Sequence, residues 1–206
     1  MSARGHYGSD KKQEKSFFDV KRLVKARHAL IKCLPLCHYL FIVTKLKKIY
    51  TMNNESLMRR AIALSEESVR TGGGPFGAVI AKDGVVIAEA SNSVTIDNDP
   101  TAHAEVNAIR AACARLRSFD LSGCEIYCSC EPCPMCLGAI YWARLGHIYF
   151  ANDRKAAGAI GFSDDLIYND IPLDLDKRSI PIDVLLPTEG AKAFDMWREK
   201  TDKTEY

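Results

Sequence analysis

The sequence predicts an α/β protein with three layers, α/β/α, around a mixed sheet of roughly five strands. The first reason is that segments with helical spacing of apolar residues alternate with short strand-like segments along residues 53–201, a pattern typical of layered α/β domains. The second is the sequence Lys82-Asp83-Gly84 between two strand-like segments, because Asp-Gly is a strong signal for a hairpin turn. Helical segments separate the later strands, so βα crossovers should follow the antiparallel hairpin.

The domain is expected to open with a helix capped by Asn53 or Asn54, since asparagine is a favoured N-cap residue. Apolar side chains recur at helical spacing after this point: Leu57, Ala61, Leu64 and Val69. The run GGGP at residues 72–75 should end the helix, because glycine and proline both disfavour its continuation.

The other elements are expected in a regular order. The strands are residues 77–81, 85–90, 125–130, 147–151 and 181–186. The helices are residues 103–116, 134–144 and 189–201, the last of them amphipathic. Residues 92–100 should form a polar loop, and residues 153–168, which contain two glycines and an acidic pair, should be irregular.

The charge of the chain is divided unevenly. Residues 1–51 contain 12 Lys and Arg against 3 Asp and Glu, a net charge of +9. Residues 52–206 contain 16 Lys and Arg against 23 Asp and Glu, a net charge of −7. The change coincides with the start of helical spacing, so we expect residues 1–51 to be a basic N-terminal extension, either disordered or not part of the fold. Residues 52–206 should form one folded domain.

One continuous apolar run lies in the extension, at residues 33–44 (CLPLCHYLFIVT). It has 12 residues, against roughly 20 for a helix that crosses a bilayer. Three lysines follow it instead of a small-residue cleavage site, which argues against a secretory signal. A basic helix on a membrane surface is an alternative, but we expect no membrane association and assign no metal to Cys33 or Cys37.

The cysteines are concentrated in one part of the chain, with six of the eight between residues 113 and 136. Neither a signal peptide nor the small size of a disulfide-stapled secreted domain accompanies them. We therefore expect a reducing, cytoplasmic setting, with Cys113, Cys124 and Cys128 as small buried side chains.

Two short stretches contain the residues of a catalytic metal site. The first has His103 and, two residues later, Glu105; the second has Cys133 and Cys136 in a Pro-Cys-x-x-Cys pattern. A hydrolytic zinc site needs three protein ligands and an open position for water, and His103, Cys133 and Cys136 supply three. Two sulfurs and an imidazole suit Zn²⁺ better than Mg²⁺ or Ca²⁺, which prefer oxygen. Glu105 is near enough in sequence to exchange a proton with the water without being a ligand itself.

Prolines flank Cys133 on both sides and predict a loop that turns into a helix. Cys133 would then lie at the helix N-terminus, where the helix dipole favours a thiolate. The alternative is a closed, non-catalytic structural zinc module with Cys128 or Cys130 as the fourth ligand. The predicted strand argues against it, because alternate residues of a strand face opposite sides, and a structural module has no use for Glu105.

The His-x-Glu and Pro-Cys-x-x-Cys motifs are similar to those of the cytidine deaminase superfamily of zinc-dependent hydrolases. Within this superfamily the chain most closely resembles bacterial-type guanine deaminases. The stretches that carry the resemblance are residues 74–80 (GPFGAVI), 98–105 (NDPTAHAE), 131–144 (EPCPMCLGAIYWAR) and 203–206 (KTEY). The resemblance extends from about Met52 to Tyr206 and covers nothing before Met52.

The resemblance implies a hydrolase of purine catabolism or salvage that converts guanine to xanthine and ammonia. It implies one zinc ion per chain as the cofactor. Water attacks the amine-bearing ring carbon, C2 of guanine. Glu105 moves a proton from the water first to the adjacent ring nitrogen and then to the leaving ammonia.

The resemblance also implies a set of substrate contacts: Asn92, Asp164, Phe76, Trp142, Ala104 and Tyr206. The Asn92 amide offers a donor and an acceptor to a purine edge, and Asp164 can accept from ring N–H groups, with Asp165 as its rival. Ser163 stands where an acid is expected in relatives, so the choice between the two stays open. The two large aromatic residues are stacking walls or core side chains. Tyr206 matches a tail tyrosine that the partner subunit supplies, so a homodimer with a swapped C-terminal segment is expected.

A tRNA adenosine deaminase is the main alternative, since such enzymes share the pattern at residues 99–105 (DPTAHAE) and the cysteine pair. A tRNA enzyme must neutralise phosphates with Lys and Arg, whereas residues 52–206 carry a net charge of −7. The basic extension could still serve as a nucleic-acid arm. We expect a small purine base as the substrate and no nucleic-acid partner.

Overall fold

The computed structural model describes residues 51–205. The expectations for the basic extension, for the apolar run at residues 33–44 and for Tyr206 lie outside these residues. Within the described part, no helix is both long and apolar enough to cross a membrane.

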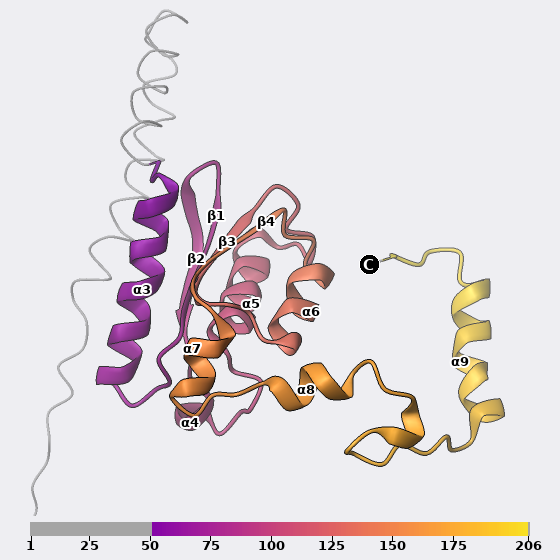
Figure 1. The fold of residues 1–206 in the computed structure, drawn as a ribbon. Coiled ribbons are helices and arrows are strands. Elements are labelled where there is room, and N and C mark those ends of the chain that lie inside the picture. The colour runs from indigo at the N-terminus through magenta and orange to yellow at the C-terminus, as the bar shows by residue number, and fades with distance from the viewer. Residues whose placement is uncertain (1–50, 206) are drawn as a thin grey trace, which may run out of the picture. The chain divides into compact units, whose positions relative to one another are not determined.

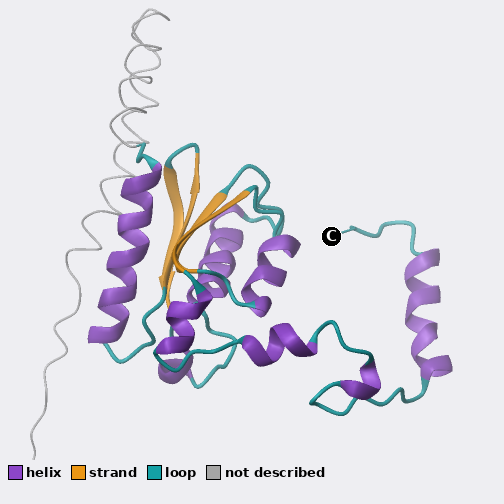
Figure 2. Cartoon of the chain, in the orientation of Figure 1, coloured by secondary structure: helices purple, strands orange, loops and turns teal. Residues whose placement is uncertain are grey.

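A mixed sheet of four strands is the centre of the described residues (Figures 1 and 2). The strands are β1 (Gly77–Lys82), β2 (Val85–Ser91), β3 (Glu125–Cys130) and β4 (His147–Asn152). Their order in the sheet is β2-β1-β3-β4. β1 is antiparallel to both β2 and β3, whereas β3 and β4 are parallel. The predicted succession of a hairpin and a later crossover is therefore present.

The hairpin between β1 and β2 forms as its sequence predicts. Lys82 pairs with Val85, so only two residues connect the strands. Both of them, Asp83 (φ 51°) and Gly84 (φ 73°), adopt the left-handed conformation. A two-residue turn with two positive φ angles follows the right-handed twist of the strands, and Asp-Gly is a favoured sequence for it.

Helices cover both faces of the sheet (Figure 1). Helix α3 (Asn54–Arg70) begins at Asn53, whose side-chain oxygen accepts from Ser56 N at 2.8 Å. It packs on one face in a core cluster of Leu57, Ala61, Val79, Ala81 and Tyr127.

Helices α5 (Ala104–Leu116) and α6 (Pro134–Trp142) cover the other face. The main buried residues there are Ala78, Ile80, Ala104, Ala108, Ala112, Ile126, Cys128 and Ile140. The first five residues of β1 are buried in sequence because alternate side chains enter opposite clusters. The α/β/α layering is confirmed.

The expected fifth strand at residues 181–186 was wrong, and the described sheet has four strands. Pro181 has no N–H to donate to a ladder, and Leu186 adopts a left-handed conformation (φ 54°) that ends the extended run. Val184 and Leu185 are 76 % and 85 % exposed. The segment contains apolar residues, but within the described chain no strand pairs with it.

The segment expected to be irregular, residues 153–168, contains two short helices. These are α7 (Arg154–Ala159) and α8 (Asp165–Asp170), each of six residues. Fewer than two turns are too short for apolar periodicity to show. Asp153 did offer a signal, because it caps α7 by accepting from Ala156 N at 2.8 Å.

Three further elements complete the described chain: α4 (Val94–Asp97), the 3₁₀ turn Leu175–Lys177 and α9 (Pro187–Glu199). α4 lies inside the expected polar loop, and α9 is the expected closing helix. Its bounds differ by two residues at each end from those expected.

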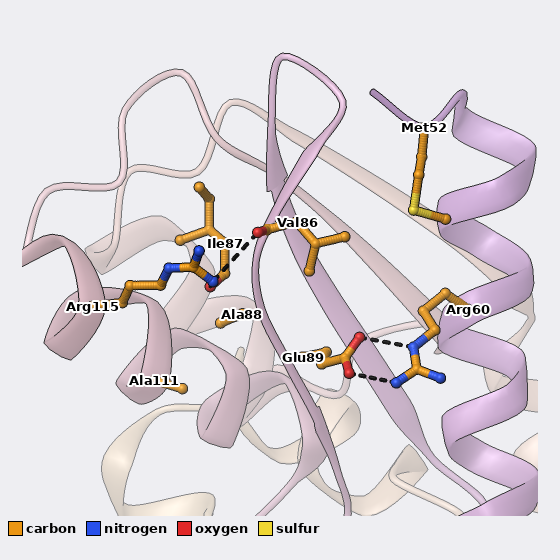
Figure 3. A pocket seen from close by; sticks show the side chains of 8 residues that line it. All are labelled: Met52, Arg60, Val86, Ile87, Ala88, Glu89, Ala111 and Arg115. Carbon is orange, nitrogen blue, oxygen red and sulfur yellow. Dashed lines mark hydrogen bonds and ion pairs between the residues drawn. The ribbon is translucent and has the colours of Figure 1, made fainter. Parts of the chain in front are cut away.

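Charged side chains border the edge strand β2 (Figure 3). Arg60 of α3 forms a two-pronged ion pair with Glu89, and Arg115 of α5 donates to Ile87 O at 2.7 Å. A cavity of about 500 Å³ lies beside them, lined by Met52, Arg60, Val86, Ile87, Ala88, Glu89, Ala111 and Arg115. No expected site residue lines this cavity. Charges at a sheet edge protect it from pairing with another chain, which is a sufficient account of the two arginines.

Candidate metal centre and active site

His103 and Glu105 lie at the N-terminus of α5. His103 is the N-cap residue, with extended backbone angles (φ −69°, ψ 153°), and Glu105 is in the first turn. A tight turn precedes them, in which Asp99 Oδ1 accepts from the backbone N and the hydroxyl of Thr101 at 2.8 and 2.7 Å. This turn orients the chain as it enters the helix.

Cys133 and Cys136 lie at the N-terminus of α6. Cys133 is the N-cap residue and a proline follows it at the first helical position, as the sequence predicted. A spacing of three residues in the first turn places both sulfurs on the same side of the helix. The metal motif is therefore built from two helix N-termini that meet.

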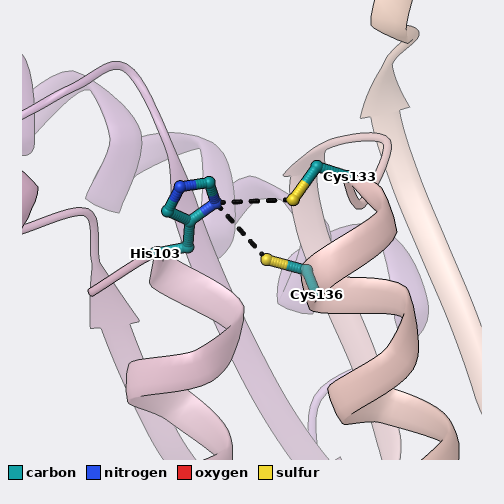
Figure 4. Close-up of side chains that lie close together, drawn as sticks. All are labelled: His103, Cys133 and Cys136. Carbon is teal, nitrogen blue, oxygen red and sulfur yellow. Dashed lines mark hydrogen bonds between the residues drawn. The ribbon is translucent and has the colours of Figure 1, made fainter. Parts of the chain in front are cut away.

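The three expected ligands come together (Figure 4). Their ligand atoms all lie within 4.8 Å of one another. His103 Nδ1 is 3.6 Å from Cys133 Sγ and 3.5 Å from Cys136 Sγ. Tetrahedral zinc with Zn–S of about 2.3 Å and Zn–N of about 2.0 Å requires a nitrogen–sulfur separation of about 3.5 Å. The donor set and its spacing therefore fit zinc.

Electrostatics at the cluster favour a thiolate at Cys133, the form that binds a metal ion. The hydrogen bond between the two thiols lowers the pKa of Cys133 to about 4 and, together with burial, raises the pKa of Cys136 far above the usual thiol range. Hydrogen bonding to Cys133 also raises the pKa of His103, against the effect of burial. Metal ligation needs thiolates and a neutral imidazole, so a divalent cation would displace the remaining proton.

Glu105 is buried beside the ligands. It is 7 % exposed, and its Oε2 lies 3.4 Å from Cys136 Sγ. Burial raises the pKa of its carboxyl group, because water no longer stabilises the charged form. A buried carboxyl group beside a metal site can both accept and return a proton.

Neither Cys128 nor Cys130 joins the cluster of potential ligands. Cys130 Sγ instead lies 3.6 Å from Asp153 O, and burial raises its pKa to about 11. Burial likewise raises the pKa of Cys128 well above its usual value. The described residues thus provide three protein ligands, as a catalytic zinc site requires.

Zinc content should distinguish the two cysteine roles. We expect Cys133→Ser protein to lose most of its zinc after dialysis, because it loses a thiolate ligand, whereas Cys130→Ser protein should keep about one zinc per chain. Elemental analysis of the purified proteins measures this directly. Loss of zinc from Cys130→Ser protein that remains folded would support the closed four-ligand module.

Asn92 lies directly after β2 and is buried, with 6 % exposed. Its backbone N donates to Phe76 O at 3.0 Å, and its Oδ1 accepts from Val94 N at 3.3 Å. Gly73 permits this arrangement, because a Cβ there would lie 2.5 Å from Asn92 O and 2.4 Å from Ser68 Oγ. Two expected substrate contacts, Asn92 and Phe76, are therefore neighbours.

Asp164 is partly buried at the start of α8. Burial raises its pKa, and the charge of Cys133 adds to this effect, which places Asp164 within electrostatic reach of the metal cluster. Asp165 is exposed and accepts from Ser163 Oγ at 3.1 Å. Asp164 is therefore the more buried of the two acids, and its assignment as the substrate carboxylate stays a prediction.

Phe162 was missed by the sequence reasoning. Its ring packs edge-on against Phe76, with centroids 5.1 Å apart and an interplanar angle of 89°. The contact joins the loop before Asp164 to the segment of Asn92. A large aromatic residue two positions before the candidate acid was the available signal.

The other expected contacts are placed differently. Trp142 ends α6 and is 69 % exposed. The side chain of Ala104 is fully buried in the core, so a substrate could meet it only through its backbone at the start of α5. Tyr206 is not among the described residues.

A family model for the cytidine and deoxycytidylate deaminase zinc-binding region matches residues 51–152. Guanine deaminase of Bacillus subtilis (strain 168) is 51 % identical over 156 residues, which are 75 % of this chain and 100 % of the relative. The chain belongs to the cytidine and deoxycytidylate deaminase family.

Solved structures of this deaminase family agree with the sequence match. The X-ray structure of the Bacillus subtilis guanine deaminase has a TM-score of 0.73 and covers 75 % of this chain and 99 % of that one. A guanine deaminase from Nitrosomonas europaea has a TM-score of 0.54 at 32 % identity, covering 55 % and 67 %. A tRNA-specific adenosine deaminase of Aquifex aeolicus (strain VF5) is 41 % identical over 53 % of this chain and 73 % of its own length.

Proposed function

We propose that the protein is a zinc-dependent guanine deaminase, which hydrolyses guanine to xanthine and ammonia. The observation that carries this proposal is the 51 % identity to a guanine deaminase along that protein's entire length. The geometry of the site agrees with it, because a buried carboxyl group accompanies three zinc ligands. We expect the enzyme to act in purine catabolism or salvage.

Zinc held by His103, Cys133 and Cys136 would supply a water molecule activated at neutral pH. Glu105 accepts a proton from the attacking water and delivers it to the ring nitrogen beside C2 of guanine. It then transfers a proton to the departing ammonia. Its burial suits the first step, because burial raises the pKa of the carboxyl group and so makes the carboxylate a better proton acceptor.

Recognition of the purine is assigned to the residues around the metal cluster. The Asn92 amide can donate to and accept from a purine edge, and Asp164 can accept from ring N–H groups. Phe76 provides an aromatic surface beside Asn92, and Phe162 extends it through their edge-on contact.

The charge of the domain disfavours a tRNA substrate. A polynucleotide enzyme must neutralise several phosphates with Lys and Arg, whereas residues 52–206 carry a net charge of −7. The tRNA-specific relative also resembles a smaller part of this chain, 53 % against 75 % for the guanine deaminase.

A substrate panel tests the proposal. We expect zinc-loaded protein to release ammonia from guanine at a kcat/KM at least about 100-fold above that for adenine, cytosine or an adenosine-containing tRNA loop, because a site built to pair with one ring edge rejects others by large factors. Coupled ammonia detection measures all four side by side. Preferential turnover of the tRNA loop would show that the substrate is a tRNA and not guanine.

The exposed C-terminal segment supports a homodimer. Within the described chain, α8 and α9 contain no buried residue. Phe194 and Met196 are 74 % and 71 % exposed, and Trp197 of the same helix is 42 % exposed. Apolar patches of this kind mark interaction sites. We infer that the C-terminal segment of each chain packs on a partner subunit and carries Tyr206 to the partner's active site.

A cytoplasmic location is part of the same proposal. All six cysteines of the described residues are free thiols. Cys133 and Cys136 must stay reduced to bind zinc, and a reducing compartment provides this condition.

The basic extension should be dispensable for catalysis. We expect a protein that starts at Met52 to keep its zinc and its kcat/KM for guanine within about twofold, since the change of net charge and the start of helical spacing both fall at this point of the sequence. Met52 itself is retained because its backbone N donates to Gly84 O at 2.8 Å and its side chain packs on the core of α3. Loss of folding or of activity would show that residues 1–51 contribute to the domain.

A further inference from the structure

Asn107, in the second turn of α5, links the metal helix to the segment that carries Asn92. Its side-chain nitrogen lies 3.2 Å from Ser91 O, 3.0 Å from Ser93 Oγ and 3.3 Å from Ala102 O. The first two acceptors belong to the residues on either side of Asn92. The third belongs to the residue immediately before the histidine ligand. One amide group therefore contacts both the segment of Asn92 and the residue before the ligand His103.

We propose that Asn107 is a positioning residue, which fixes Asn92 relative to the zinc ligand His103. The proposal rests on the assignment of Asn92 to substrate binding made above. The three acceptors share the two hydrogens of one NH₂ group, so at least one of its hydrogen bonds is bifurcated. Such a group ties its three partners to one point on α5, at 3.0–3.3 Å from its nitrogen.

Asn107 adds an anchor towards the metal helix to the segment after β2, where Asn92 N also donates to Phe76 O and Asn92 O accepts from Ser68 Oγ. Asn92 lies beyond the last residue of β2, and ten residues separate it from His103. One backbone hydrogen bond closes this loop, from Ser93 N to Ala102 O at 3.0 Å. Asn107 donates to atoms at both ends of the same loop, so its loss should let the two ends move relative to each other. A displacement of about 1 Å at a binding group can cost about 100-fold in activity.

A purely structural role is the competing explanation, and the effect on KM separates the two. Asn107→Leu has nearly the same size and removes the donor. Asn107→Asp keeps the shape but cannot donate to the two carbonyl oxygens, Ser91 O and Ala102 O. We expect both variants to keep about one zinc per chain and a kcat within about threefold, while KM for guanine rises about tenfold, because the removed contact orients a binding group and not the proton carrier.

Asn53→Ala is the matched control. It removes the N-cap of α3, whose side chain accepts from Ser56 N, and Asn53 belongs to no part of the site. Loss of a cap should lower Tm by about 2–4 °C in a domain of this size. Its KM should remain that of the wild type, which shows that a loss of stability alone does not raise KM.

A double-mutant cycle tests whether Asn107 affects KM through the position of Asn92. In an Asn92→Ala background, Asn107→Leu should change KM by less than about twofold, since coupled residues are not additive. The same tenfold increase in both backgrounds would overturn the proposal. So would an unchanged KM in Asn107→Leu, or loss of zinc, which would mean that the amide serves the histidine ligand instead.

Hydrogen exchange provides a readout that does not depend on the reaction. Exchange of backbone amides in residues 91–102 should be at least about tenfold faster in Asn107→Leu than in the wild type, with the central strands unchanged. Unchanged exchange in this loop would contradict the proposal. If the substrate panel identifies another ring, the KM measurements use that ring, so failure of the guanine assignment and failure of the positioning role remain distinguishable.

Discussion

Replacing Glu105 by Gln should lower kcat/KM for guanine by about 10²–10⁴-fold, the usual contribution of general acid–base catalysis. Gln keeps the size of the side chain but cannot carry the proton from water to the ring. Zinc should remain at about one per chain, because the three ligands are untouched. Steady-state kinetics and elemental analysis on the same preparation measure both quantities.

Glu125→Gln provides the control for this change. Glu125 is a partly buried glutamate at the start of β3, where it accepts from Tyr127 Oη at 2.7 Å. Glu125 belongs to no part of the metal site, so the activity of the Glu125→Gln variant should stay near that of the wild type. Near-normal activity in Glu105→Gln protein would contradict the proposed proton transfer, whatever the control shows.

The metal cluster could be predicted from the sequence because its determinants are local. His103 and Cys133 are each the N-cap residue of a helix, and the remaining ligand and Glu105 lie in the first turns. The spacing within each turn fixes the direction of these side chains. The spacing alone could not predict that the two helix N-termini lie side by side. That expectation came from the family resemblance. The hairpin was predictable for the same reason, since two residues determine its turn.

Contacts between distant segments could not be predicted in this way. Phe162 reaches Phe76 across 85 intervening residues, and no periodicity relates them. The short helices α7 and α8 were missed because their length is below the range in which spacing is informative. The false strand at residues 181–186 shows the opposite error, since β-branched and apolar residues were present but no partner edge was available in the described chain.

Deleting residues 203–206 should reduce guanine turnover by about 100-fold or more while leaving zinc content and fold intact. The physical reason is that a small planar substrate needs a lid that excludes water from all but the attacking position. The deleted residues are remote from the metal ligands in sequence, and the apolar side chains of α9 are exposed. The deletion should therefore affect closure of the site without disturbing the core. Circular dichroism and zinc analysis test whether the core and the metal site are unchanged.

Mixing two inactive proteins tests whether the C-terminal tail closes the active site of its own subunit or that of the partner subunit. The first lacks residues 203–206 and has an intact Glu105; the second is full-length with Glu105→Gln. In a swapped homodimer, the mixed dimer has one site with both an intact Glu105 and a partner's tail. Random subunit exchange should then restore about a quarter of the wild-type activity, because half of the dimers are mixed and each has one working site. A tail that acts in its own subunit leaves both kinds of site defective, and activity stays absent although exchange is complete. Labelled subunits demonstrate the exchange, so recovery or its failure reports only on the path of the C-terminal segment.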